Sequence, residues 1–171
     1  LPAPQQPVRV MARVYDPDRV STVILHFRRD PGRDITSVPM VDDGSGPDEL
    51  ANDGIYTGAI PGQTSSTIVA FTIEAADAST PKATTVFPAQ PQTRECLIRW
   101  GEPTPNSAFG SYRIWIAKED HDFWANREKM SNEDVPVTFV YGSHRVIYSA
   151  GARYSGSSYT APGYNSPTGN L

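Results

Sequence analysis

The chain has 171 residues, a length typical of one ordinary domain or two small ones. Its net charge of −4, without any dense group of Lys and Arg, gives no electrostatic case for binding nucleic acid. No apolar run approaches the roughly 20 residues that a membrane-spanning helix needs. Sixteen Pro and thirteen Gly favour many turns and few long helices, which indicates a mainly β protein.

Both ends of the sequence suggest a piece of a longer protein. Residues 1–7 are Pro-rich and predict an extended lead-in. The chain starts at Leu1 without an initiator Met, and Leu171 follows no element that would close a fold, so we expect a downstream continuation to be its partner. Cys96 is the only cysteine, which excludes an internal disulfide framework and leaves export open.

Residues 8–87 read as a series of short strands between turns. In residues 8–15, apolar Val8, Val10, Ala12 and Val14 alternate with more polar side chains, as in a strand with one buried face. Gly, Pro and Asp turns at this spacing predict a β-sandwich of immunoglobulin or fibronectin-III type. The expected strands cover residues 8–15, 20–27, 35–41, 55–60, 67–76 and 83–87.

Residues 88–94 begin with a proline-rich stretch and predict a linker. Residues 95–171 then predict a β-rich segment with one short helix at residues 118–130. Acidic Glu119 and Asp120 would lie in the first helical turn, and basic Arg127 and Lys129 in the last. Phe123 and Trp124 would anchor the helix. The remaining strands are expected at residues 96–100, 112–117, 137–141 and 145–153.

The loop at residues 42–54 carries four aspartates in two Asp-Gly contexts. Calcium prefers six to eight oxygen ligands, and this loop offers several carboxylates, although the spacing is not that of an EF-hand. The alternative is that Asp and Gly only shape turns between strands, and we favour it because Asp-Gly is common in β proteins. The candidate metal ligands are Asp42, Asp43, Asp48 and Asp53.

Other familiar sites find no support in the sequence. His26, His121 and His144 lie far apart and lack the spacing of a zinc site. No motif around Cys96 would activate its thiolate, so we expect a small buried side chain. The sequence also lacks a Gly-x-Ser-x-Gly elbow, a Walker A loop and a GxGxxG fingerprint.

A loop of small residues follows the last predicted strand. Arg153, the backbone amides near Gly156 and the nearby serine hydroxyls are groups that donate hydrogen bonds to phosphate oxygens. The tyrosines of this region would instead stack on sugar rings. An ordinary surface loop is the third interpretation and the one the motif alone favours. The candidate phosphate-binding residues are Arg153, Gly156, Ser157 and Ser158.

Residues 114–164 resemble the start of a CotH-type domain, the spore-coat-protein-H kinase family. The features that match are Ile114-Trp115, the Trp-containing helix with Ser131-Asn132, residues 138–141 and 145–148, and the loop from Arg153 to Ser157. The preceding segment resembles the Ig-like module that often lies upstream of such domains in large exported bacterial proteins. The segments that match this module are residues 42–56, 60–62 and 71–77.

The resemblance implies an atypical kinase fold that transfers the γ-phosphoryl group of ATP to protein Ser or Thr with a divalent metal such as Mg²⁺. In such kinases the catalytic aspartates lie well downstream of the Arg…Gly-Ser loop, and this chain stops at Leu171 before they would appear. Ser155 also stands where the family pattern has a second basic residue. We therefore expect no catalysis from this chain alone, and ATP and Mg²⁺ only for a longer parent protein.

Two functional hypotheses follow. In the first, the chain is a fragment of an exported bacterial multidomain protein, at the cell surface or outside the cell, with an Ig-like spacer or adhesion module and an incomplete CotH-like lobe. In the second, it is a β module that binds carbohydrate or another surface ligand. The side chains expected to carry this binding are Tyr154, Tyr159, Tyr164 and Trp100. A spacer with no ligand is the plainest alternative.

Overall fold

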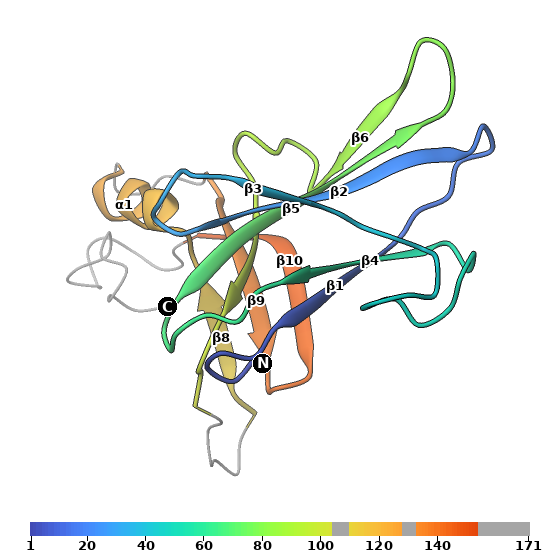
Figure 1. Ribbon diagram of the computed structural model, residues 1–171. Helices are drawn as coiled ribbons and strands as arrows, with labels where there is room; N and C mark the ends of the chain where they lie inside the picture. Colours follow the sequence, from blue (N-terminus) through green and yellow to red (C-terminus); the bar gives the residue numbers. More distant parts are fainter. Residues whose placement is uncertain (104–109, 128–132, 154–171) are drawn as a thin grey trace.

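The computed structural model describes residues 1–103, 110–127 and 133–153. These residues form ten β-strands and one short α-helix, so the predicted mainly β class is confirmed (Figure 1). The strands are arranged in a five-stranded, a two-stranded and a three-stranded antiparallel sheet. The assignment to the immunoglobulin or fibronectin-III type stays a prediction.

The five-stranded sheet is built around β5 (Ile68–Asp77), whose sequence is rich in β-branched and apolar residues. β2 lies along one edge of β5 and carries β3 on its outer side. The other edge of β5 is shared, because β7 pairs with its first half and β6 with its second half. The partners of β5 in this sheet are β2 (Val20–Arg29), β3 (Thr36–Pro39), β6 (Thr84–Phe87) and β7 (Cys96–Arg99).

The two-stranded sheet consists of β1 (Val8–Arg13) and β4 (Ile55–Ile60). It covers one face of the five-stranded sheet, and the two sheets enclose the larger apolar core. As the alternation in the sequence predicts, Val10 is buried while Arg9, Met11 and Arg13 are exposed. The core includes Val10 and Ile60 from the small sheet and Val23, Leu25, Val69, Phe71 and Ile98 from the large one.

The three-stranded sheet has the order β10-β9-β8 and packs on the opposite face of β5 and β7. Its strands are β8 (Tyr112–Trp115), β9 (Val135–Tyr141) and β10 (Arg145–Ala152). A second apolar cluster fills this interface and contains Ala70, Leu97, Trp115, Ala117 and Val140. Leu97 also donates its backbone N–H to the Thr138 hydroxyl at 3.0 Å, which ties β7 to β9.

The helix α1 (Lys118–Asn126) is shorter than the predicted span of residues 118–130. Arg127 has an extended backbone and ends the helix, so this residue lies just beyond the last turn in which it was expected. Lys129, the other basic residue expected there, lies outside the described residues. Glu119 and Asp120 do occupy the first turn. Of the two predicted anchors, Trp124 is fully buried, whereas the prediction for Phe123 is wrong because its side chain is 45% exposed.

Contacts cross the predicted boundary at residues 88–94, which hold no strand. β7 begins at Cys96, one residue beyond this segment, and pairs with β5 in the five-stranded sheet. The N-terminal stretch is also fixed in place, because Trp100 donates its indole N–H to the carbonyl of Gln6 at 2.8 Å and Gly101 donates its N–H to Pro2 at 3.0 Å. The division into a lead-in, a sandwich, a linker and a second region stays a prediction.

Candidate functional site

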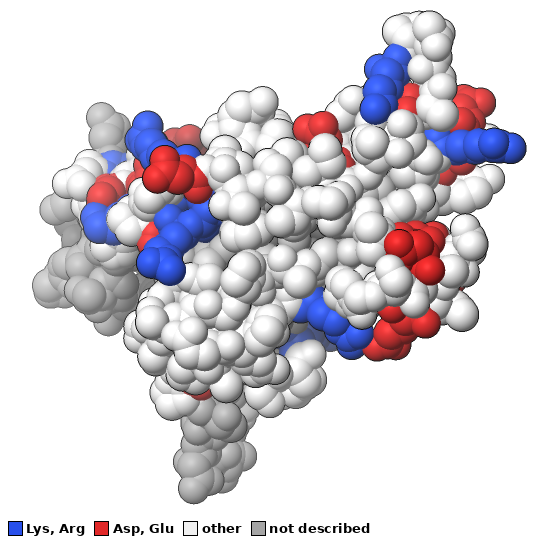
Figure 2. Space-filling view, viewed as in Figure 1, with Lys and Arg blue, Asp and Glu red and all other residues white. Residues whose placement is uncertain are grey.

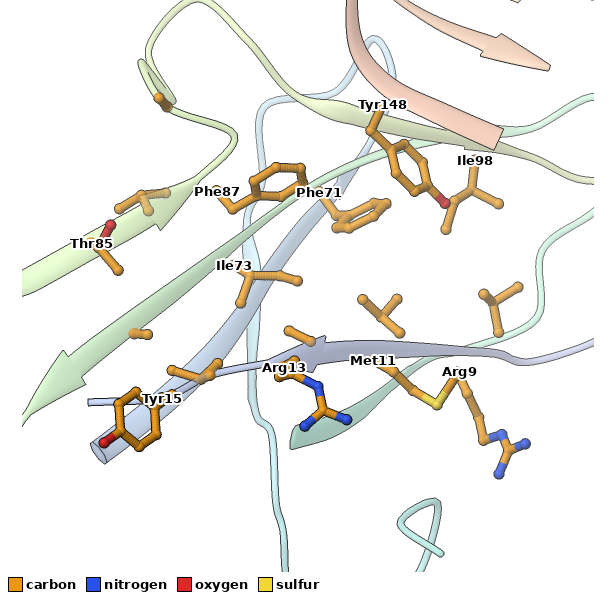
Figure 3. Close-up of a pocket in the computed structure, with 17 residues that line it drawn as sticks. Arg9, Met11, Arg13, Tyr15, Phe71, Ile73, Thr85, Phe87, Ile98 and Tyr148 are labelled. Atoms are coloured by element: carbon orange, nitrogen blue, oxygen red, sulfur yellow. The ribbon is translucent and has the colours of Figure 1, made fainter. Parts of the chain in front are cut away.

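A groove of about 650 Å³ runs along β1, between this strand and the edge of the five-stranded sheet formed by β6 and β7 (Figure 3). Its floor is apolar and belongs to the larger core, with Phe71, Ile73 and Ala75 of β5. Tyr148 of β10 also lines it. All eight residues from Val8 to Tyr15 line the groove, so the exposed feature is the edge of the strand itself.

The edge of β1 that faces away from β4 has no strand partner among the described residues. Val14 donates its N–H to the carbonyl of Gly54 at 2.9 Å, which shows which residues of β1 form hydrogen bonds with β4. In an antiparallel pair only alternate residues exchange hydrogen bonds, so Val8, Val10 and Ala12 bond to β4. The N–H and C=O groups of Arg9, Met11 and Arg13 therefore point to the free edge.

The rim of the groove is rich in exposed apolar side chains. Met11 and Tyr15 lie on or just after β1, and Phe87 ends β6; they are 59%, 86% and 51% exposed. Phe87 lies on the floor side of the groove beside its cross-strand neighbour Ile73, and Met11 lies on the other side of β1, so exposed apolar side chains border both sides of the free edge. Exposed apolar surface of this kind indicates an interaction site. Together with the free strand edge, they make this groove the candidate functional site.

Two arginines accompany the free edge. Arg9 forms an exposed ion pair with Glu49 at 2.6 Å. For Arg13, no ion pair or hydrogen bond of the side chain is seen within the described residues. On the face shown in Figure 2, basic and acidic atoms are intermixed and form no large patch of one sign. Arg13 is therefore a cation at the groove that is available to a partner.

A β-bulge places Tyr148 at the groove. The register of β10 against β9 shifts between Ile147 and Ala150, so that Tyr148 and Ser149 lie opposite one residue of β9, and Ser149 has a φ of 53°. Arg94 donates to the carbonyl of Ser149 at 3.3 Å, which holds the bulge from the loop before β7. Burial raises the pKa of Tyr148 from its ordinary value of 10 to about 12.

A second cleft, of about 950 Å³, lies where α1 meets the end of β2 and is lined mainly by charged residues. Arg28 donates two hydrogen bonds to Glu95 and one to Asp30, and Asp30 also accepts the backbone N–H of Lys118 at the start of α1. Burial and the negative charges of Glu95 and Glu119 raise the pKa of Asp120 to about 6. These hydrogen bonds of Arg28 and Asp30 join β2, the segment before β7 and the start of α1, so we interpret the cleft as a structural network.

The four aspartates predicted as metal ligands all accept hydrogen bonds inside their own region. Asp42 accepts the N–H groups of Asp53 and Gly54, and Asp53 accepts that of Ile55. Asp43 accepts from Ser45, while buried Asp48 accepts from Gly44 and from the Thr57 hydroxyl.

Gly44 and Gly54, which complete the two Asp-Gly pairs, have φ values of 69° and 79°, the left-handed region that favours glycine. These backbone angles and hydrogen bonds are the ones expected if Asp and Gly only shape turns between strands. Within the described residues, no group of three or more His, Cys, Asp or Glu side chains is arranged to hold a metal ion. The calcium interpretation stays a prediction.

The predicted phosphate loop is only partly described. Arg153 is exposed directly after β10, whereas Gly156, Ser157 and Ser158 lie outside the described residues, as do the three tyrosines proposed to stack on sugars. The expectation that Trp100 binds a ligand is wrong, because its side chain is fully buried and its indole N–H bonds to Gln6.

In the described part of the chain, no helix is long and apolar enough to cross a membrane.

The groove along β1 could not be predicted from the sequence pattern. Its signal was the strongly alternating segment at residues 8–15, in which arginines flank an exposed methionine. That pattern predicts which face of the strand is buried, but it does not show on which edge a neighbouring strand is missing.

No protein-family model matches the chain, and the comparisons with curated proteins and with solved structures found no match either. The fold and the groove are therefore the basis for a functional proposal.

Proposed function

We propose that this chain is a protein-binding β module that accepts an extended polypeptide segment as an additional strand along β1. The single observation that carries the proposal is the free edge of β1, where the N–H and C=O groups of Arg9, Met11 and Arg13 face an apolar groove. In strand addition, such backbone groups provide affinity and the adjacent pockets select side chains.

The dimensions of the groove suit such a ligand. The eight residues that line it along β1 correspond to about 26 Å of extended chain at roughly 3.3 Å per residue. Every second side chain of an added strand would point to the floor formed by Phe71, Ile73 and Ala75. An unpaired edge is also a site at which proteins associate, and the usual protection by a covering element is not seen at β1 within the described residues.

This proposal takes up the adhesion role that the sequence predicts for the first part of the chain. A location at the cell surface or outside the cell belongs to the same proposal. In this proposal, the chain binds a polypeptide partner and catalyses no reaction. A kinase activity of a longer parent protein is a separate prediction, and it is supported by the resemblance of residues 114–164 to the CotH-type family alone.

A peptide-display selection tests the proposal. The library holds ten-residue peptides with apolar residues at alternate positions, and a matched library carries a central Pro. We expect the protein to enrich peptides from the first library only, because Pro removes a donor that strand pairing needs. In hydrogen exchange, the selected peptides should protect the amides of Arg9, Met11 and Arg13.

Met11→Pro supplies the decisive variant. The Met11 N–H points away from β4, so the substitution removes one free-edge donor and leaves the β1–β4 ladder in place. We expect peptide binding to weaken about tenfold or more, since one edge hydrogen bond is lost and the approach of the ligand is blocked.

Ser37→Pro is the matched control, because the Ser37 N–H likewise points to the free edge of β3. This control should bind peptides normally. The proposal is refuted if no peptide is enriched over the Pro library, or if Met11→Pro, shown to be folded by circular dichroism, binds as the wild type does. Binding on a glycan array without peptide binding would instead favour the carbohydrate hypothesis.

A further inference from the structure

We infer that the segment bound at β1 carries two acidic residues four positions apart, separated by residues that alternate into the apolar groove. This inference rests on the proposed strand addition and names the chemistry of the partner. It follows from which side chains of β1 share a face, and from the charges on that face.

The geometry of β1 sets the spacing. Figure 3 shows Arg9, Met11 and Arg13 on the side of β1 opposite to Phe71, Ile73 and Tyr148. Residues directly opposite each other on adjacent strands point to the same face of the sheet. A partner residue opposite Arg9 and another opposite Arg13 are therefore four positions apart on the outer face, with a third opposite Met11 between them. The intervening side chains point toward the groove.

The charges on this face select acidic residues. Arg9 and Arg13 are both exposed on β1, and opposite charges placed directly across from each other stabilise strand pairing. Arg9 already has Glu49 as a partner at 2.6 Å, whereas Arg13 has no ion pair within the described residues. The acidic residue opposite Arg13 should therefore contribute more to binding than the one opposite Arg9.

The same charges argue against a second copy of β1 as the occupant. If two β1 strands paired antiparallel about Met11, Arg9 of each copy would lie opposite Arg13 of the other. In a parallel pair in register, each arginine would lie opposite its own copy. Like charges directly opposite each other destabilise strand pairing. The occupant is thus expected to be a different segment.

The sequence after β10 does not have the required chemistry either. Residues 154–171 contain no Asp or Glu and two Pro, so this stretch offers no acidic side chain for Arg13. A segment with acidic residues on one face and apolar residues on the other complements both the arginines and the floor of the groove. The structure therefore favours a separate acidic, extended polypeptide.

Three synthetic peptides test the inference. They share the sequence Thr-Val-Xaa-Val-Thr-Val-Xaa-Val-Thr, in which Xaa is Glu, Gln or Lys at both positions. The dissociation constant of each is measured by fluorescence anisotropy at low and at high salt. We expect the Glu peptide to bind about tenfold more tightly than the Lys peptide, with the Gln peptide between them, and the difference to shrink at high salt.

In the Arg13→Glu variant, the peptide position opposite residue 13 should prefer Lys to Glu. The position opposite Arg9 should still prefer Glu. Arg145→Glu is the matched control, because it makes the same change of charge on an exposed residue of β10 and should leave the order of the peptides unchanged. Peptides with a single Glu identify which position lies opposite Arg13, where the larger effect is expected.

The outcomes separate this inference from the proposed function. If the Gln peptide binds and the Glu and Lys peptides bind equally well, the inference is overturned while strand addition stands. The same holds if Arg13→Glu leaves the preference unchanged. If none of the three peptides binds and the display selection also fails, strand addition itself is refuted and the inference falls with it.

Discussion

The ring of Tyr148 packs edge-on against the ring of Phe71, with 5.5 Å between the ring centroids and 80° between the ring planes. Phe71 lies in the central strand β5, and Tyr148 lies in β10 of the three-stranded sheet. The pair therefore connects strands that the sequence assigns to two different regions. It also forms part of the groove along β1, so the shape of the candidate site depends on it.

Replacing Tyr148 by Ala should destabilise the protein. The substitution removes an aromatic side chain that is packed against the larger core, and we expect the free energy of unfolding to fall by about 2 kcal/mol or more. Tyr148→Phe keeps the ring, so it should cost less than about 1 kcal/mol. Urea denaturation of the two variants measures both values. Equal stability of wild type and Tyr148→Ala would show that the edge-on contact contributes nothing.

Cys96 should make the protein less stable in alkaline solution. Its side chain is fully buried, and burial together with the nearby negative charge of Glu95 raises the pKa of the thiol to about 12. The unfolded thiol ionises near pH 9, so this stabilising contribution is complete below that pH and is lost as the pH rises toward about 12. Within this window the free energy of unfolding should fall by up to about 1.4 kcal/mol per pH unit for this group.

Cys96→Ala removes the titrating group and serves as the comparison. Below pH 9 it lowers stability through the lost packing, so the test is the slope of stability against pH and not its absolute value. We expect a shallower slope between pH 9 and 12 than in the wild type. An identical slope would mean that the folded protein leaves this thiol free to ionise.

Asp120 and Asp122 lie in the same helix and should respond to pH in opposite ways. Burial and like charges raise the pKa of Asp120 to about 6, so its stabilising contribution is present below pH 4 and is lost as the pH rises through 6. Asp120→Asn should therefore raise the melting temperature at pH 7, and this gain should disappear near pH 4.

The hydrogen bond from Lys118 lowers the pKa of Asp122, whose contribution is lost only as the pH falls. Asp122→Asn should therefore lower the melting temperature slightly at pH 7. Calorimetry of the two variants at pH 4 and pH 7 checks both signs. A fall in melting temperature for Asp120→Asn at pH 7 would show that its carboxylate is stabilised by a partner.

Local patterns predict the fold class but leave the candidate site open. The alternation at residues 8–15 correctly predicts which side chains of β1 are buried, because side chains in a strand alternate with a period of two. The groove, in contrast, combines β1 with Phe71, Phe87, Ile98 and Tyr148, which come from four other strands. Which edge of β1 stays unpaired is decided by these distant pairings.

The same limit explains what the sequence missed in the second half of the chain. The position of Tyr148 depends on a bulge at Ser149, which a period-two pattern does not indicate. The proline-rich residues 88–94 suggest a boundary, yet β7 shortly after them joins the sheet of β5 through non-local pairing. Composition indicates where the chain turns, but it does not determine which strands meet afterwards.

The loop of four aspartates offers a test between its two interpretations. Asp42 accepts the N–H groups of Asp53 and Gly54 at 3.1 and 3.0 Å, so Asp42→Ala leaves two donors without their acceptor. We expect a loss of about 1–2 kcal/mol in the free energy of unfolding, and a smaller loss for Asp42→Asn, which keeps one acceptor oxygen. If these carboxylates only stabilise the turns, adding calcium chloride should leave the melting temperatures of the wild type and of both variants unchanged. A calcium-dependent rise in the wild type that is absent in Asp42→Asn would establish the metal site instead, because an ion that binds only the folded state must stabilise it.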